Sequence, residues 1–177
     1  MNEKKHLPER KPTRLRGYDY NCDGAYFITI CTQNRKHILS RIVGDGAHDV
    51  PQAILTEIGE TVKKRILSSN KIKNIFVEQY VIMPNHVHMI VRVANGMLAE
   101  GVNVQNGTSR APSPTNTAIP RFVSTLKRFC HAECGQKIFQ RSYHDHIIRN
   151  GKDYEKIFDY IQNNPAQWED DCFYAAR

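Results

Sequence analysis

The residues best suited to chemistry are two histidines separated by one residue, His86 and His88. They lie in an apolar, β-branched run at residues 80–91, which is typical of a strand. Side chains alternate between the two sides of a strand, so both imidazoles project to one side, about 6–7 Å apart at ~3.3 Å per residue. Two imidazoles at that spacing can converge on one small cation. The other side of the strand faces a core with Val87, Met89, Val91 and Val93.

The segments around this strand predict an antiparallel sheet with helices packed on it, an α+β sandwich. Strands are expected at 25–32 and 74–83, and Pro84 and Asn85 form a tight connection into the histidine strand. The strand at 25–32 is almost continuously apolar, which indicates a central, buried position. Helices are expected over 51–67, from Pro120 onward and from Asn150 to about Asn164, with an extended segment over 138–149.

The chain of 177 residues is most simply one domain, from residue 17 to 177, preceded by a basic tail at 1–16. Residues 95–120 are rich in Gly, Asn, Ser, Thr and Pro and predict a flexible loop inside that domain. No apolar run approaches the ~20 residues that cross a bilayer. Five cysteines without C-x-x-C pairs favour a reducing cytoplasm, and a net charge of +7 is compatible with a polyanionic partner.

The last predicted helix carries two polar groups beside its apolar stripe. Tyr160 and Asn164 are one turn apart on a neighbouring, more polar face, and the Asn164 carbonyl oxygen suits a hard divalent ion. The apolar stripe itself follows helical spacing and comprises Tyr154, Ile157, Phe158 and Ile161.

Two other groups of residues compete for a metal role. Cys130 and Cys134 flank His131, but no second pair of ligands follows at finger-like spacing, so ordinary helix cysteines are the simpler interpretation. His144 and His146 form a second His-x-His pair in the segment expected to be extended.

Several blocks of residues, in order along the chain, resemble the HUH single-tyrosine transposases, and among them the REP-associated tyrosine transposases. The blocks are MPNHVH at 83–88, YHDHIIR at 143–149 and DYIQNNP at 159–165, with further likeness at 16–32 and 164–169. The resemblance covers most of the chain from about residue 14 to 168, apart from the loop at 95–120.

The resemblance implies a ferredoxin-like fold with the histidine pair on a central strand and the Tyr160 helix across the face that displays it. It implies that His86, His88 and Asn164 bind Mg²⁺ or Mn²⁺ and that Tyr160 is the nucleophile. His146 belongs to a recurring block of the family that is not its metal motif, so His144 and His146 rank second as ligands.

The activity implied is cleavage and rejoining of single-stranded DNA near hairpins through a 5′-phosphotyrosine. Relatives work as monomers or exchange the tyrosine helix within a homodimer, so both states are open. Two alternatives are a catalytically silent hairpin-binding regulator and a metal-dependent phosphohydrolase in which Tyr160 is only packed.

The helix from Pro120 is expected to expose Arg121, Lys127 and Arg128. Candidate DNA contacts are Lys127, Arg128, Arg141, Tyr143, His146, Arg149 and Lys152.

Overall fold

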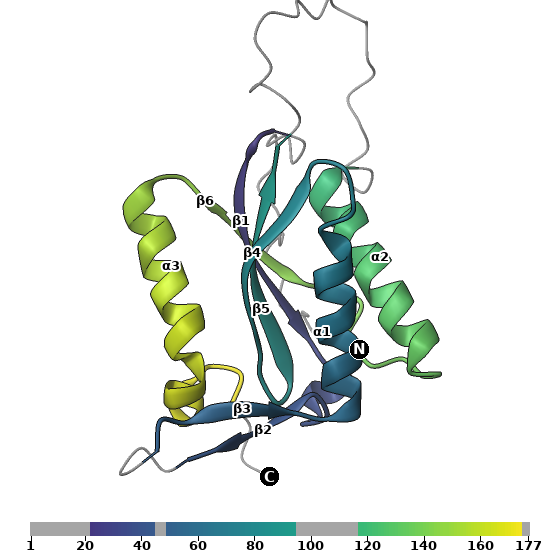
Figure 1. Cartoon of the computed structure of the whole chain (residues 1–177), viewed down its shortest axis with the longest axis vertical. Coiled ribbons are helices and arrows are strands. Elements are labelled where there is room, and N and C mark those ends of the chain that lie inside the picture. Colours follow the sequence, from purple (N-terminus) through teal and green to yellow (C-terminus); the bar gives the residue numbers. More distant parts are fainter. Residues whose placement is uncertain (1–21, 45–48, 95–116, 175–177) are drawn as a thin grey trace, which may run out of the picture.

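The computed structural model describes residues 22–44, 49–94 and 117–174. The expected tail at 1–16 and nearly all of the expected loop at 95–120 lie outside the described residues. An antiparallel four-stranded sheet in the order β4–β5–β1–β6 forms the centre, and β2 and β3 form a separate two-stranded sheet (Figure 1). The elements are β1 Gly24–Cys31, β2 Ser40–Val43, β3 Gln52–Leu55, α1 Glu57–Ser69, β4 Ile75–Ile82, β5 His86–Val93, α2 Ala118–Glu133, β6 His144–Ile148 and α3 Gly151–Asn163, with short 3₁₀ helices η1 Gln33–Arg35 and η2 Asn164–Asp170.

Helices cover the two faces of the central sheet unequally. Helices α1 and α2 lie side by side on one face, and α3 lies alone on the other (Figure 1). The face under α1 and α2 holds the larger apolar core. The face under α3 holds a smaller one, centred on Ala25, Ile90, Ile157 and Ile161. This ferredoxin-like α+β arrangement is the fold that the sequence predicts.

Strand β5 shows the predicted alternation between the two faces. Its apolar side is completely packed, and each such side chain contributes roughly 1.5–3 kcal/mol through burial. These residues, buried together with Tyr26, Ile28 and Ile30 of β1, are Val87, Met89, Val91 and Val93. His86 and His88 point to the opposite face. The predicted central position of β1 is also confirmed, because it pairs with β5 and β6.

The helix predicted from Pro51 is wrong in its first turns. Residues 52–55 form β3, which pairs with β2, a strand that the sequence did not predict. The helix begins only after Thr56, whose hydroxyl accepts from the Gly59 amide at 3.1 Å and whose own amide donates to the Leu39 carbonyl at 2.9 Å. A Cβ at Gly59 would lie 2.0 Å from the Leu39 carbonyl oxygen, so this close approach requires glycine. Tertiary contacts with residues 38–43 therefore override the helical pattern.

The other predicted boundaries agree with the structure to within a few residues. Helix α2 begins at Ala118, slightly before the expected Pro120. In the segment expected to be extended, β6 occupies 144–148, and Phe139 forms an isolated bridge with Thr32. Asn150 caps α3 as predicted, because its side-chain oxygen accepts from the Asp153 amide at 2.9 Å.

Lys127 does not lie on an exposed helix face, contrary to the prediction. Its side chain is buried, and Nζ donates to the carbonyl oxygens of Gln140, Arg141 and Ser142 at 2.8, 3.3 and 2.7 Å. Burial lowers the pKa of Lys127 to about 8. An ammonium used in this way fixes the segment before β6 and is not available to phosphate.

No helix of the described residues is long and apolar enough to span a bilayer.

Candidate active site

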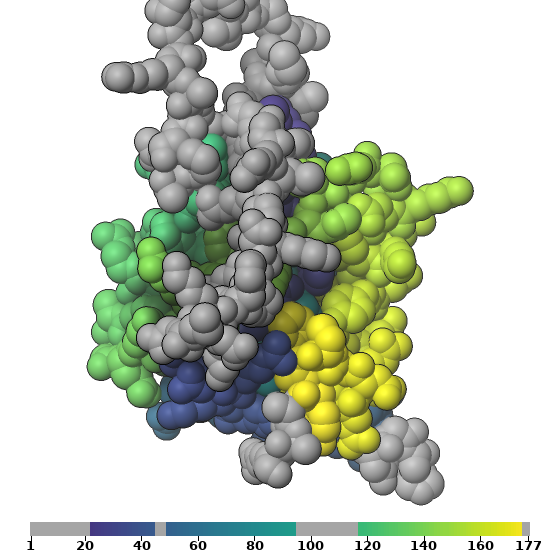
Figure 2. All heavy atoms as spheres, turned by 180° about the vertical axis from the view of Figure 1, so that it is seen from behind, coloured from purple at the N-terminus to yellow at the C-terminus, as the bar shows by residue number. Residues whose placement is uncertain are grey.

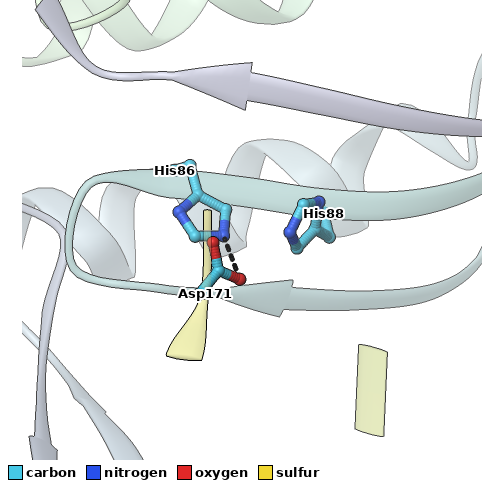
Figure 3. Close-up of side chains that lie close together, drawn as sticks. All are labelled: His86, His88 and Asp171. Atoms are coloured by element: carbon cyan, nitrogen blue, oxygen red, sulfur yellow. Dashed lines mark ion pairs between the residues drawn. The ribbon is translucent and has the colours of Figure 1, made fainter. Parts of the chain in front are cut away.

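The two histidines lie on β5 against the α3 side of the sheet, with their rings side by side (Figure 3). Their ring centroids are 4.4 Å apart, so the predicted shared face is confirmed. Both side chains are buried, at 0% and 1% exposure. Phe173 covers them, with its ring centroid 4.7 Å from that of His86 and 5.8 Å from that of His88.

Asn85 fixes the tautomer of His86. The Asn85 amide nitrogen donates to the Phe173 carbonyl at 2.8 Å, which leaves its oxygen facing His86 Nδ1 at 2.8 Å. His86 Nδ1 must therefore carry the proton, and Nε2 keeps its lone pair. Among the described residues, that buried Nε2 has no hydrogen-bond partner. An oriented, unpaired imidazole nitrogen is what a metal ligand requires.

His88 is held from both sides. Its Nδ1 lies 2.8 Å from the hydroxyl of Thr29, the residue opposite it on β1. The Phe27 ring stacks on the imidazole at 5.0 Å with an interplanar angle of 29°. Its Nε2 points to the hydroxyl of Tyr160 at 3.3 Å. Strand pairing thus orients His88 toward the helix that crosses this face.

Helix α3 brings Tyr160 to the histidines. The apolar stripe of α3 packs on the sheet as predicted, and Tyr160 extends beside that core. Its ring meets Phe27 edge to face at 6.1 Å. Asn164 follows one turn later, at the start of η2, and is fully buried. The structure therefore brings together the four residues that the sequence selected: His86, His88, Tyr160 and Asn164.

Asp171 is the member of the site that the sequence did not reveal. Its Oδ2 accepts from the Tyr160 hydroxyl at 3.0 Å and from Asn164 Nδ2 at 2.9 Å, and it lies 3.9 Å from His86 Nε2 (Figure 3). In the sequence it follows Glu169 and Asp170 in an acidic run, so no pattern distinguishes it. Only the return of the chain after η2 places this carboxylate at the site.

Burial shapes the electrostatics of these groups. It lowers the pKa of His86 to about 4, although the Asp171 carboxylate opposes the effect. It also lowers the pKa of His88, and the neighbouring His86 adds to the shift. Both imidazoles are therefore neutral near pH 7. Burial, followed by the charge of Asp171, raises the pKa of the Tyr160 phenol, so the site as it stands disfavours a phenolate.

The donor set fits a divalent cation. One ligand atom from each of His86, His88 and Asp171 lies within 4.8 Å of the others, and in the described part of the chain these residues form the one such group. The Asn164 amide donates its nitrogen to Asp171, which leaves Oδ1 buried and without a hydrogen-bond partner among the described residues. Two orphaned lone pairs, on His86 Nε2 and Asn164 Oδ1, would both be satisfied by a cation between them.

The rival pair of histidines lies on the same face but at the sheet edge. His144 pairs with Thr29 and His146 with Phe27, two strands from β5 in the order β5–β1–β6. Both side chains are exposed, and His146 Nε2 is bonded to Asp153 at 2.9 Å. No metal-binding group of the described residues contains Cys130, His131 and Cys134, and the His131 ring accepts from the Phe139 amide instead.

The predicted DNA contacts are spread over the molecule. Arg141 and the half-buried Tyr143 precede β6, at the end of the sheet nearer the histidines. Arg149 and Lys152 follow β6 at the opposite end, about 13 Å farther along the strand. Arg128 lies on α2, across the sheet from the site. Arg35, which the sequence analysis did not select, is exposed, and its guanidinium lies over the Phe173 ring at 5.2 Å.

Comparison with known proteins supports the resemblance that the sequence blocks carry. The chain is 32% identical over 180 residues to an uncharacterised protein of Haemophilus influenzae, covering 95% of this chain and 94% of that protein. It is 25% identical over 145 residues to a REP-associated tyrosine transposase of Escherichia coli, covering 81% of this chain and 67% of that protein. The chain is thus similar to a REP-associated tyrosine transposase, as the sequence blocks predict.

The fold is also similar to that of a solved transposase structure. A solved structure of a REP-associated tyrosine transposase bound to a REP hairpin superimposes with a TM-score of 0.57 at 20% identity, covering 92% of this chain and 74% of that one. No protein-family model matches the sequence.

Proposed function

We propose that this protein is a divalent-metal-dependent transposase that cleaves and rejoins single-stranded DNA beside hairpins through a 5′-phosphotyrosine at Tyr160. One observation carries the proposal. The Tyr160 hydroxyl lies against His88 Nε2 and the Asp171 carboxylate, beside the unpaired lone pairs of His86 and Asn164. This arrangement supports the proposal, because it would bring a nucleophile, a proton acceptor and a cation site together.

The partner is inferred from the relatives. The Escherichia coli relative is a REP-associated tyrosine transposase, and the structural neighbour is bound to a REP hairpin. We therefore assign hairpin DNA with an adjoining single strand as the partner, in the cytoplasm and at the nucleoid. A single strand can thread to a recessed tyrosine, whereas a duplex would hide its bases and phosphates. The active unit is a monomer, or a homodimer if α3 serves a second subunit.

His86, His88 and Asn164 would hold the cation, and Asp171 offers a further donor. Two imidazole nitrogens make a softer set than Mg²⁺ prefers, so Mn²⁺ should bind more tightly. A bound divalent cation would supply positive charge that offsets both the carboxylate and the charge developing on the scissile phosphate.

The residues of the chain then have distinct tasks. Tyr160 attacks phosphorus; its Oη–P bond forms, the bond from phosphorus to the 3′ oxygen breaks, and that oxygen leaves as a hydroxyl after taking up a proton. Asp171 Oδ2 already accepts the phenol hydrogen bond and is positioned to take the phenol proton. Asn85 and Thr29 hold the two imidazoles in orientation. Because the phosphoester is exchanged and not hydrolysed, a DNA 3′-hydroxyl can reverse the attack and rejoin strands.

Covalent capture tests the proposal. The protein is incubated with Mn²⁺ and a labelled hairpin oligonucleotide that carries single-stranded flanks, and covalent protein–DNA adducts are separated under denaturing conditions. We expect an adduct with the wild type and with Tyr154→Phe, a matched tyrosine of the α3 core stripe. We expect none with Tyr160→Phe, because phenylalanine has no hydroxyl to attack phosphorus.

The other outcomes identify the alternatives. An adduct that persists in Tyr160→Phe would exclude Tyr160 as the nucleophile. Cleavage without an adduct would indicate a hydrolase that uses water. Hairpin binding without cleavage would indicate a regulator, and the complete burial of His86 gives that outcome some structural support. His86→Ala should remove cleavage while hairpin affinity changes by less than roughly tenfold.

A further inference from the structure

A cleft of about 890 Å³ lies beside the site, between β2 and η2. Residues of both segments meet at the lower end of the molecule, where the yellow C-terminal residues lie against the blue residues near position 40 (Figure 2). Trp168 lines the cleft, and its ring centroid is 5.9 Å from that of His86. One side chain therefore separates the cleft from the proposed cation site, and the volume lies in the usual range for ligand pockets.

We infer that this cleft binds a nucleobase of the DNA strand next to the bond that Tyr160 breaks, and that it prefers a base with an exocyclic amino group to thymine. The inference rests on the proposed function, because it assigns the cleft to the same strand. It adds a specificity-determining site to that function.

The walls of the cleft are aromatic. Trp168 meets His37 at 5.6 Å and Tyr174 at 5.3 Å, both edge to face. Trp168 itself is nearly buried, but Tyr174 is 40% exposed and His37 is partly exposed. Exposed ring surface of this kind stacks on bases of any sequence, because every base has a π face.

Ser40 supplies a hydroxyl group that forms no hydrogen bond within the described part of the chain. Its side chain lines the cleft and is 4% exposed, and no described residue forms a hydrogen bond with its Oγ. Buried hydroxyl groups are normally paired, so an unpaired one in the wall of a cleft indicates a ligand that completes it. A hydroxyl both donates and accepts, which suits the edge of a base.

The charges at the cleft favour a base over the phosphate backbone. Glu169 and Asp170 lie on its η2 side, opposite Arg41 on β2. Two carboxylates repel phosphate, but they accept hydrogen bonds from the amino groups of cytosine, adenine or guanine. Thymine has no such amino group, and the expected preference follows from this difference.

Fluorescence of Trp168 tests the inference directly, because it is the one tryptophan of the chain. The full-length protein, in EDTA so that no metal contributes, is titrated with short single-stranded oligonucleotides of deoxycytidine, of thymidine and of abasic sugar-phosphate. We expect saturable quenching by deoxycytidine, roughly tenfold weaker binding of thymidine, and no saturable quenching by the abasic strand. Equal responses to all three probes would overturn the inference.

Variants separate a ligand site from a structural role. Ser40→Ala should weaken deoxycytidine binding by roughly fivefold to tenfold while the unfolding midpoint stays the same or rises, since an unpaired buried hydroxyl is removed. Glu169→Gln, on an exposed side chain, should reduce the preference for deoxycytidine over thymidine. Ser124→Ala, on exposed α2 surface, is the matched control and should change nothing. Lower stability of Ser40→Ala with unchanged quenching would show a structural serine and overturn the inference.

The adduct assay, run on the same preparations, keeps the two proposals distinct. An adduct at Tyr160 together with base-independent quenching would overturn the base site alone. Base-dependent quenching that requires Ser40, without an adduct, would overturn the proposed reaction alone.

Discussion

The two faces of the central sheet are built from the same strands but are closed in different ways. Under α1 and α2, β5 packs Val87 and Met89 into a continuous apolar core. Under α3, the same strand presents His86 and His88 to a layer of aromatic rings and polar atoms, some of them unpaired. One helix covers only part of that face, and the segment after it brings Phe173 over the two histidines. The first face therefore supplies stability, and the second keeps unsatisfied groups for a ligand.

The largest effect should come from the apolar face. Met89→Ala removes a fully buried side chain and should lower the free energy of unfolding by roughly 2–5 kcal/mol, measured by urea denaturation. Stabilisation by Mn²⁺ should persist, because no ligand is altered. Ile54→Ala, at a 41% exposed position of β3, is the control. A loss below about 1 kcal/mol would show that this face is not the stabilising one.

The buried histidines of the other face should make the protein less stable in acid. In EDTA, the unfolded chain protonates His86 near pH 6.5, but the folded protein does so only near pH 4. Between these values the unfolded state binds more protons, so the free energy of unfolding falls as the pH falls, by about 3 kcal/mol in total. This stability is complete above about pH 6.5 and lost below about pH 4. His86→Gln should be less pH-sensitive by that amount, and equal slopes would contradict a buried neutral imidazole.

A metal should stabilise through the same face. At a free concentration of 100 times its Kd, Mn²⁺ should add about 2.7 kcal/mol to the free energy of unfolding. For a chain of this size, each kcal/mol raises the Tm by roughly 2–4 °C. We expect His86→Gln to abolish the increase and Asn164→Ala to reduce it. An unchanged increase in Asn164→Ala would remove Asn164 from the ligand set and leave Asp171 as the third donor.

The smallest expected effects come from the residues that cap the N-termini of α3 and α1. Asn150→Ala, at the start of α3, should cost about 1 kcal/mol of unfolding free energy. Thr56→Ala, at the start of α1, should cost at least about as much, because its hydroxyl also donates to the Ile38 carbonyl at 2.7 Å. Only Asn150→Ala should slow adduct formation, since α3 carries Tyr160. Equal slowing by both variants would mean that overall stability, and not the position of α3, limits the reaction.

Much of the site could be predicted because it depends on local periodicity. The period of two on β5 placed His86 and His88 on one face, and the period of the helix placed Asn164 one turn from Tyr160. Lys127 shows where such reasoning fails. A basic residue on a helix looks solvated, but the carbonyls of residues 140–142 approach it from another part of the chain. The prediction of a helix from Pro51 is wrong for the same reason, because residues 52–55 pair with β2.

The sequence by itself determined the α+β class, the histidine strand, the tyrosine helix and the resemblance to the HUH transposases, since these depend on residue types at short spacings. The tertiary structure alone decided that Asp171 joins the site and that Ser40 faces a cleft beside Trp168. Both arrangements join segments that are far apart in the sequence. His88 and Asp171 are separated by 83 positions, and Ser40 and Trp168 by 128. No local period records such an arrangement, because its position is set by how α3, η2 and β2 pack against the sheet.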